Sequence, residues 1–170
     1  MSIQTNVKIN DLQGKKILVI DDDPDLCQLV AGTFAKTGAQ VFAAASGYEG
    51  LRQFFEHRPD LVFIDIMMPK MDGWEVCRRI RQVAEIPLII LSALENENDV
   101  ARGLDCGAID FVTKPFSPKV LRARAQSALR QVTPPTAAEQ PAIYSDDYLR
   151  QEGGRAPDSC PRQPGQANPD

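Results

Sequence analysis

Five short apolar runs alternate with helix-length segments along the first 133 residues. Short continuous apolar runs, bounded by polar residues, are typical of parallel strands that are buried on both faces. Strands that alternate with helices predict an α/β fold, in which helices cover both faces of one sheet. Right-handed crossovers and the strongly apolar first run favour a doubly wound, five-stranded parallel sheet in the order 2-1-3-4-5. The expected strands are residues 16–20, 40–44, 61–64, 87–91 and 109–113.

Start and stop signals place a helix after each expected strand. Asp23 is suited to cap a helix that begins at Pro24 and ends before Gly38. Ser46 and Glu49 have the spacing of a capping box, and this second helix ends before residue 59. The remaining helices are expected over residues 74–83, 98–105 and 118–132.

The two ends of the chain differ in composition from the segment between them. Residues 1–14 are polar and are expected to form a flexible leader before a domain over residues 15–133. Residues 134–170 hold seven of the thirteen prolines, no lysine and few large aliphatic side chains. Such a segment buries too little apolar surface to offset its ordering entropy, so we predict a disordered tail.

Charge and cysteine content exclude several classes of protein. The formal net charge is −4, so the chain lacks the basic surface of a nucleic-acid-binding domain. No segment approaches the roughly 18 apolar residues of a membrane span, and the leader lacks the apolar core of a signal peptide. The four cysteines, Cys27, Cys77, Cys106 and Cys160, form no CxxC motif, and reduced thiols in the cytoplasm are expected.

Polar side chains with distinct chemistry follow four of the apolar runs. Asp21, Asp22 and Asp23 follow the first run, and Asp65 follows the third. Ser92 follows the fourth run, and Lys114 follows the fifth. Because ligands of open parallel sheets bind beyond the carboxyl ends of the strands, one pocket is expected to hold all of these groups. Several carboxylates, a hydroxyl and an ammonium suit a divalent cation together with a phosphoryl group.

This ordered set resembles the receiver domain of two-component response regulators. The likeness covers residues 16–132 and implies a flavodoxin-like receiver fold. It is carried by residues 20–23 (IDDD), 65–73 (DIMMPKMDG), 92–93 (SA) and 114–116 (KPF).

The resemblance implies a phosphoacceptor and a metal site. Asp65 is the expected phosphoacceptor, because a carboxylate can attack phosphorus and form an acyl phosphate. Asp22 and Asp65 are expected to bind Mg²⁺ (or Mn²⁺) directly, and Asp21 either directly or through water. The family pattern adds the backbone carbonyl of Met67 as a further ligand.

The resemblance also assigns roles to residues of the last two strands. Lys114 is expected to place its charge on the phosphoryl oxygens, and its bond to Pro115 to be a cis peptide. Ser92 is expected to close on the phosphoryl group while Phe111, the switch aromatic, moves inward.

We therefore expect a phosphorylation-controlled switch with no turnover beyond its own phosphorylation and dephosphorylation. A sensor histidine kinase would supply the phosphoryl group, since the only histidine of the chain, His57, reads as a surface residue at a helix end. The output would be a change in one face of the domain. This face is formed by the expected helices over residues 98–105 and 118–132 and by the expected strand over residues 109–113. The activated chain is expected to form a homodimer through this face, in which Val100, Val120 and Ile109 replace charged residues typical of the class.

Two alternatives stay open. The receiver is closest to the winged-helix transcription-factor class, and residues 143–149 look like the start of its effector domain, with the DNA-binding domain missing or truncated. We expect no specific DNA binding from this chain alone. The second alternative, an aspartate-based phosphohydrolase, is disfavoured because haloacid-dehalogenase-type phosphatases need an acid two residues after the nucleophile, where this chain has Met67.

Overall fold

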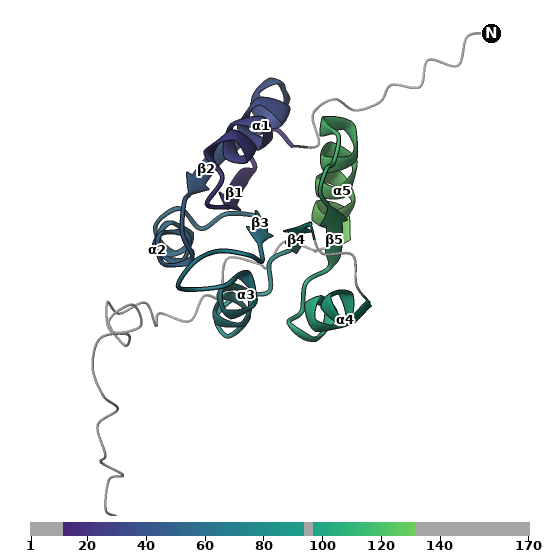
Figure 1. The fold of residues 1–170 in the computed structure, drawn as a ribbon. Coiled ribbons are helices and arrows are strands. Elements are labelled where there is room, and N and C mark those ends of the chain that lie inside the picture. Colours follow the sequence, from purple (N-terminus) through teal and green to yellow (C-terminus); the bar gives the residue numbers. More distant parts are fainter. Residues whose placement is uncertain (1–11, 94–96, 132–170) are drawn as a thin grey trace, which may run out of the picture.

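The five expected strands form one parallel sheet. The structure is a computed structural model that describes residues 12–93 and 97–131. The strand order is β2-β1-β3-β4-β5, which confirms the predicted doubly wound topology (Figure 1). The strands are β1 (Lys16–Ile20), β2 (Gln40–Ala44), β3 (Leu61–Asp65), β4 (Leu88–Ser92) and β5 (Asp110–Thr113).

Helices cover both faces of this sheet. Figure 1 shows α1 and α5 together on one face and α2, α3 and α4 on the other. None of the helices within the described ranges is long and apolar enough to cross a membrane. The helices are α1 (Pro24–Phe34), α2 (Gly47–His57), α3 (Gly73–Arg81), α4 (Glu97–Asp105) and α5 (Pro118–Gln131), and a short 3₁₀ helix (Ala35–Thr37) follows α1.

The interior strand β1 divides its side chains between two apolar cores. Leu18 and Ile20 belong to the core under α2 and α3, whereas Ile17 and Val19 belong to the core under α1 and α5. Successive side chains of a strand point to opposite faces, so a continuous apolar run feeds both cores. This explains why a strand with helices on both faces appears in the sequence as an unbroken apolar run.

Short polar side chains fix the starts of three helices. The Asp23 carboxylate accepts a hydrogen bond from the Asp25 amide (3.0 Å) at the start of α1. The Ser46 hydroxyl accepts one from the Glu49 amide (3.2 Å), as the capping box predicts. The Asp72 carboxylate accepts one from the Glu75 amide (2.9 Å) and caps α3. Each cap satisfies an amide that the first helical turn leaves unpaired.

Several boundaries differ from those predicted. Strands β3 and β4 extend to Asp65 and Ser92, so these two functional candidates are the last residues of their strands. Leu12, assigned to the leader by its polar neighbours, is 1% exposed and packs in the core under α1 and α5. The folded unit therefore begins before residue 15. Residues 1–11 and 132–170, which include the predicted tail and residues 143–149, lie outside the described ranges.

Gly73 lets α3 begin directly against the end of β3. Its amide donates to the Ile66 carbonyl oxygen (2.9 Å), and a Cβ at this position would overlap the Asp65 carbonyl oxygen and lie 2.8 Å from the Ile66 Cα. The obstacle is backbone on both sides, so a side chain cannot be accommodated by a change of rotamer. The absence of a side chain at Gly73 thus allows the start of α3 to lie directly against the backbone of Asp65.

We predict that Gly73→Ala lowers the free energy of unfolding by about 1–3 kcal/mol, because backbone must move to make room. The matched control is Gly32→Ala in α1, where a Cβ meets no atom within 4 Å. There the higher helix propensity of alanine should stabilise the protein by about 0.5–1 kcal/mol. Urea unfolding of both variants measures the difference, and equal effects of the two substitutions would contradict this account of Gly73.

Candidate functional site

Three carboxylates converge at the carboxyl ends of β1 and β3. One oxygen from each of Asp21, Asp22 and Asp65 lies within 4.8 Å of the others. Asp21 is fully buried and Asp65 is 5% exposed, whereas Asp22 is exposed. The cluster is therefore closed on the protein side and opens to solvent through Asp22.

Lys114 binds two of these carboxylates from beyond the end of β5. Its Nζ donates to Asp21 Oδ2 (2.9 Å) and to Asp65 Oδ1 (3.1 Å). Its backbone amide donates to the Ser92 carbonyl oxygen (2.7 Å), which ties the lysine to the end of β4, and the peptide bond to Pro115 is cis. One ammonium thus neutralises part of a charge that three carboxylates share.

The hydrogen bonds of Asp21 leave it little freedom. Its Oδ1 accepts from the Asp23 amide (2.9 Å), while Oδ2 accepts from Lys114. Its own amide donates to the Ala44 carbonyl oxygen (3.0 Å), and the Cys27 thiol donates to its carbonyl oxygen (3.4 Å). Asp22 and Asp65 therefore keep more oxygen lone pairs available to a cation than Asp21 does.

Burial and mutual repulsion shape the acid–base behaviour of the cluster. Desolvation, followed by the negative charge of Asp21, raises the pKa of Asp65, and the contacts with Lys114 oppose this rise. For Lys114, burial favours the neutral amine, but the hydrogen bonds to Asp21 and Asp65 outweigh it and raise the pKa. An all-oxygen donor set with excess negative charge fits a small hard cation such as Mg²⁺.

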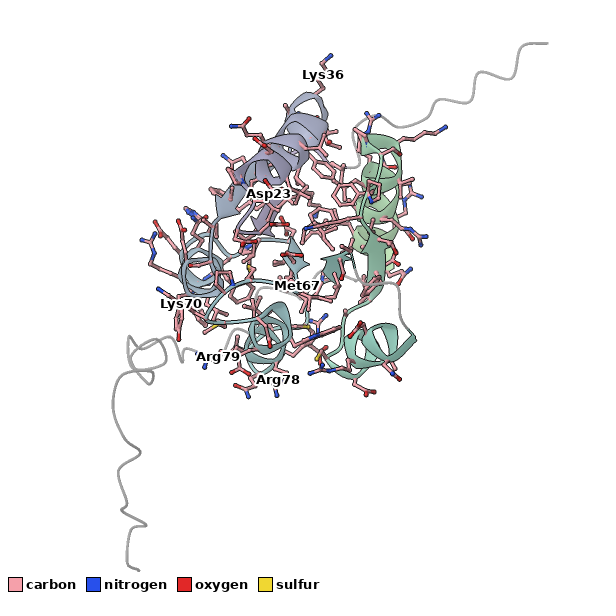
Figure 2. The ribbon with its side chains drawn as sticks, in the orientation of Figure 1. Asp23, Lys36, Met67, Lys70, Arg78 and Arg79 are labelled. Carbon is pink, nitrogen blue, oxygen red and sulfur yellow. The ribbon has the colours of Figure 1, made fainter. Side chains whose placement is uncertain are left out.

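The remaining candidates lie at different distances from this cluster. Ser92, which is 1% exposed, ends β4 one residue beyond Leu91, the partner of Asp65 in the sheet. Met67, labelled in Figure 2, lies in the loop between β3 and α3 and is 64% exposed. Phe111 is half-buried in β5 and packs with the core under α2 and α3. The structure therefore places Ser92 at the same end of the sheet as the three carboxylates. It places Phe111 against the core that α2 and α3 cover.

Sequence reasoning missed Cys27 as a neighbour of the cluster. Its side chain lies one helical turn after Asp23, and its thiol reaches back to Asp21. The spacing of four residues from the helix cap was the available signal, because such residues share one face of a helix. Burial and the charges of Asp21 and Asp23 raise the pKa of Cys27 to about 11, so this thiol is protonated at neutral pH.

Comparison of the sequence with known protein families identifies the family of this domain. Residues 17–126 match the response regulator receiver domain. The chain belongs to this family. Receiver domains are phosphorylation-controlled switches in signalling rather than metabolic enzymes, they generally bind Mg²⁺ at an acidic pocket, and sensor histidine kinases phosphorylate them.

Individual relatives and solved structures agree with this assignment. The receiver is 44% identical over 121 residues to a probable transcriptional regulator, ycf27, of Porphyridium aerugineum, which covers 71% of this chain and 50% of the relative. The receiver domain of the Francisella response regulator 1452 superposes with a TM-score of 0.67 at 34% identity, covering 71% of this chain and 100% of that one. The activated receiver domain of Klebsiella pneumoniae RstA gives 0.65 at 34% identity, covering 68% and 99%. The chain spans about half the length of the curated relatives it matches.

We predict that Asp65→Asn raises the melting temperature of the receiver by a few degrees at pH 7 without added metal. Because the pKa of Asp65 is raised on folding, the folded state binds its proton more tightly than the unfolded chain does. The stability linked to this group is gained as pH falls through the folded pKa and is absent at neutral pH. The neutral amide removes the penalty and still accepts from Lys114.

Thermal unfolding from pH 4 to pH 8 tests this prediction, and the advantage of the variant should shrink toward acid. Glu56→Gln, which removes an exposed carboxylate from α2, controls for the loss of one negative charge. A variant that is less stable than the parent at pH 7 would show that the Asp65 carboxylate contributes net stability, contrary to this prediction.

Proposed function

We propose that Asp65 of this chain accepts a phosphoryl group from a sensor histidine kinase. The observation that carries the proposal is the pair of contacts from Lys114 to Asp21 and Asp65, inside a cluster of three carboxylates. An unphosphorylated acidic pocket needs cations, and a phosphoryl group brings further negative charge to the same place. Such a pocket suits phosphoryl transfer, in which catalysis rests on positioning and charge stabilisation.

In the transfer step, one oxygen of Asp65 forms a bond to phosphorus while the bond from phosphorus to the histidine nitrogen of the kinase breaks. The electron pair of that bond stays on the histidine nitrogen, and the product is an acyl phosphate on Asp65. His57 is not placed to serve as the donor, because its carbonyl oxygen accepts from Lys16 Nζ (3.2 Å) at the start of β1, whereas Asp65 lies at the opposite end of the sheet, where β3 ends. The donor therefore comes from another protein.

The side chains around Asp65 would have three tasks in this step. Lys114 orients the carboxylate before the transfer and screens the phosphoryl oxygens afterwards. Mg²⁺ (or Mn²⁺) would be held by Asp22, Asp65 and the backbone carbonyl oxygen of Met67. Asp21 would bind it directly or through water. That ion supplies charge neutralisation for the approach of two anions. Ser92, at the adjacent strand end, supplies a hydroxyl donor for a phosphoryl oxygen.

The consequence of phosphorylation would be a population shift between two packings of α4 and β5. Phe111 of β5 packs against the core under α2 and α3. Gly103 of α4 is close to its ring, because a Cβ on Gly103 would lie 3.7 Å from it. A movement of Phe111 toward Ser92 would therefore change the packing beside α4. We infer that the change at the carboxyl ends of the strands reaches the surface through this packing.

Homodimer formation through α4, β5 and α5 stays a prediction. In the structure Arg124 pairs with Asp110 of its own chain (3.1 Å), Val120 is 43% exposed and Ile109 is half-buried against the core. Arg124 and Asp110 thus neutralise each other within one chain, and Val120 adds exposed apolar surface to this face. Sedimentation of the phosphorylated chain at low and high salt tests whether the pairing is weakly salt-dependent.

Regulation of transcription is the second function we consider. The curated relative named above is a probable transcriptional regulator, and the chain spans about half of its length. The described residues form a receiver domain. DNA binding would need a folded module outside residues 12–131.

We predict that a small acyl phosphate with Mg²⁺ adds one phosphoryl group to the protein, and that it adds it to Asp65. Asp65→Asn should abolish labelling, because an amide cannot form the acyl phosphate, and chelation of the metal should suppress it. Asp23→Asn is the matched control, since asparagine also caps a helix well and Asp23 uses its side chain for that purpose. Intact-mass measurement followed by peptide mapping locates the group. Labelling of Asp65→Asn at the parental rate would refute the assignment.

A further inference from the structure

The thiol of Cys77 on α3 contacts the backbone of a second cysteine, Cys106, in the turn between α4 and β5. The Cys77 thiol donates to the backbone carbonyl oxygen of Cys106, with 3.2 Å between sulfur and oxygen. The side chain of Cys106 is also close enough to contribute to the raised pKa of the Cys77 thiol. Both cysteines are free thiols, and 29 residues separate them along the chain.

The backbone around Cys106 is held in place by a second residue of α3. The Arg81 guanidinium donates to the Gly107 carbonyl oxygen from Nε (2.9 Å) and from Nη2 (2.7 Å). Gly107 has a φ of +81°, a conformation that favours glycine and turns the chain from α4 into β5. Two consecutive carbonyl oxygens, those of Cys106 and Gly107, therefore accept hydrogen bonds from α3, and the turn that carries Cys106 is held against the helix that carries Cys77.

The two thiols differ in access and in charge environment. Cys77 is fully buried, whereas Cys106 is half-buried. Burial raises the pKa of both thiols, that of Cys77 to about 12, while the charges of Arg78 and Arg102 oppose the rise at Cys106. Cys106 is thus the less buried of the two thiols, and the nearby arginines partly offset the rise of its pKa, whereas Cys77 is placed to react second.

We propose that Cys77 and Cys106 form a dithiol site that small-molecule disulfides oxidise to an intramolecular disulfide. The Cys106 thiolate attacks one sulfur of the external disulfide and releases one thiolate, leaving a mixed disulfide. The Cys77 thiolate then attacks the Cys106 sulfur and releases the second thiolate. Two electrons pass to the external disulfide, and the two protons of the protein thiols end on the two released thiols.

This link would join α3 to the end of α4, and its effect on signalling rests on the function proposed above. Arg102 of α4 lies over the ring of Trp74 at 5.4 Å, and a Cβ on Gly103 would lie 3.4 Å from the same ring. The covalent bond would hold α4 against Trp74 at the place where Gly103 also faces Phe111. A restrained α4 opposes the second packing, so oxidation should slow phosphorylation of Asp65.

The test uses the full chain with Cys160→Ser, so that the cysteine outside the described residues cannot exchange with the pair. Incubation with glutathione disulfide should lower the mass by two hydrogen atoms. Peptide mapping without reduction should then yield one cross-linked species that contains Cys77 and Cys106. Cys27→Ser, which removes a half-buried thiol elsewhere, should leave this product unchanged, whereas Cys106→Ser should abolish it.

The oxidised protein should also take up a phosphoryl group from a small acyl phosphate about fivefold more slowly than the reduced protein, and dithiothreitol should restore the rate. The fluorescence of Trp74, the only tryptophan of the chain, reports the same restraint through its contact with α4. Recovery of only glutathionylated Cys106, or of no modified peptide, overturns the dithiol site. Equal labelling of oxidised and reduced protein overturns its regulatory effect, and failure of the reduced protein to label would count against Asp65 instead.

Discussion

The contact of one ammonium with two carboxylates is the interaction on which the functional edge of this receiver depends. Asp21, Asp22 and Asp65 bring three negative charges together at the ends of β1 and β3, and two of them are buried. Like charges at this range raise the free energy of the folded state unless cations share the space. Lys114 supplies one cation from the chain itself, and the open side at Asp22 leaves room for a second from solvent.

The sheet makes this contact specific. Lys114 is 93 residues from Asp21 and 49 from Asp65, yet the parallel order β1-β3-β4-β5 brings all three to one edge. The start of α3 packs directly against the backbone of Asp65 at Gly73. The backbone amide of Lys114 donates a hydrogen bond to the carbonyl oxygen of Ser92. The charged groups are thus held by buried backbone, which keeps their geometry stable while one of them changes its chemical state.

Much of this arrangement could be predicted from the sequence, because the apolar runs give the strands and their polar ends give the edge. The capping residues Asp23 and Ser46 likewise act as their local pattern indicates. The contribution of Leu12 could not be predicted, since the apolar residues scattered through residues 1–14 carry no periodic signal. The meeting of Cys77 and Cys106 depends on how α3 packs against a turn 29 residues away, and no local pattern encodes that distance.

The central claim is that Lys114 and a divalent cation neutralise the same carboxylates. Calorimetric titration of Mg²⁺ into the parent protein and into Lys114→Met tests it most directly. Removal of the ammonium deletes a competing positive charge, so Mg²⁺ should bind roughly tenfold more tightly to the variant, by about 1.4 kcal/mol. Weaker or unchanged Mg²⁺ binding to Lys114→Met would contradict the account, because the lysine and the metal would then occupy independent sites.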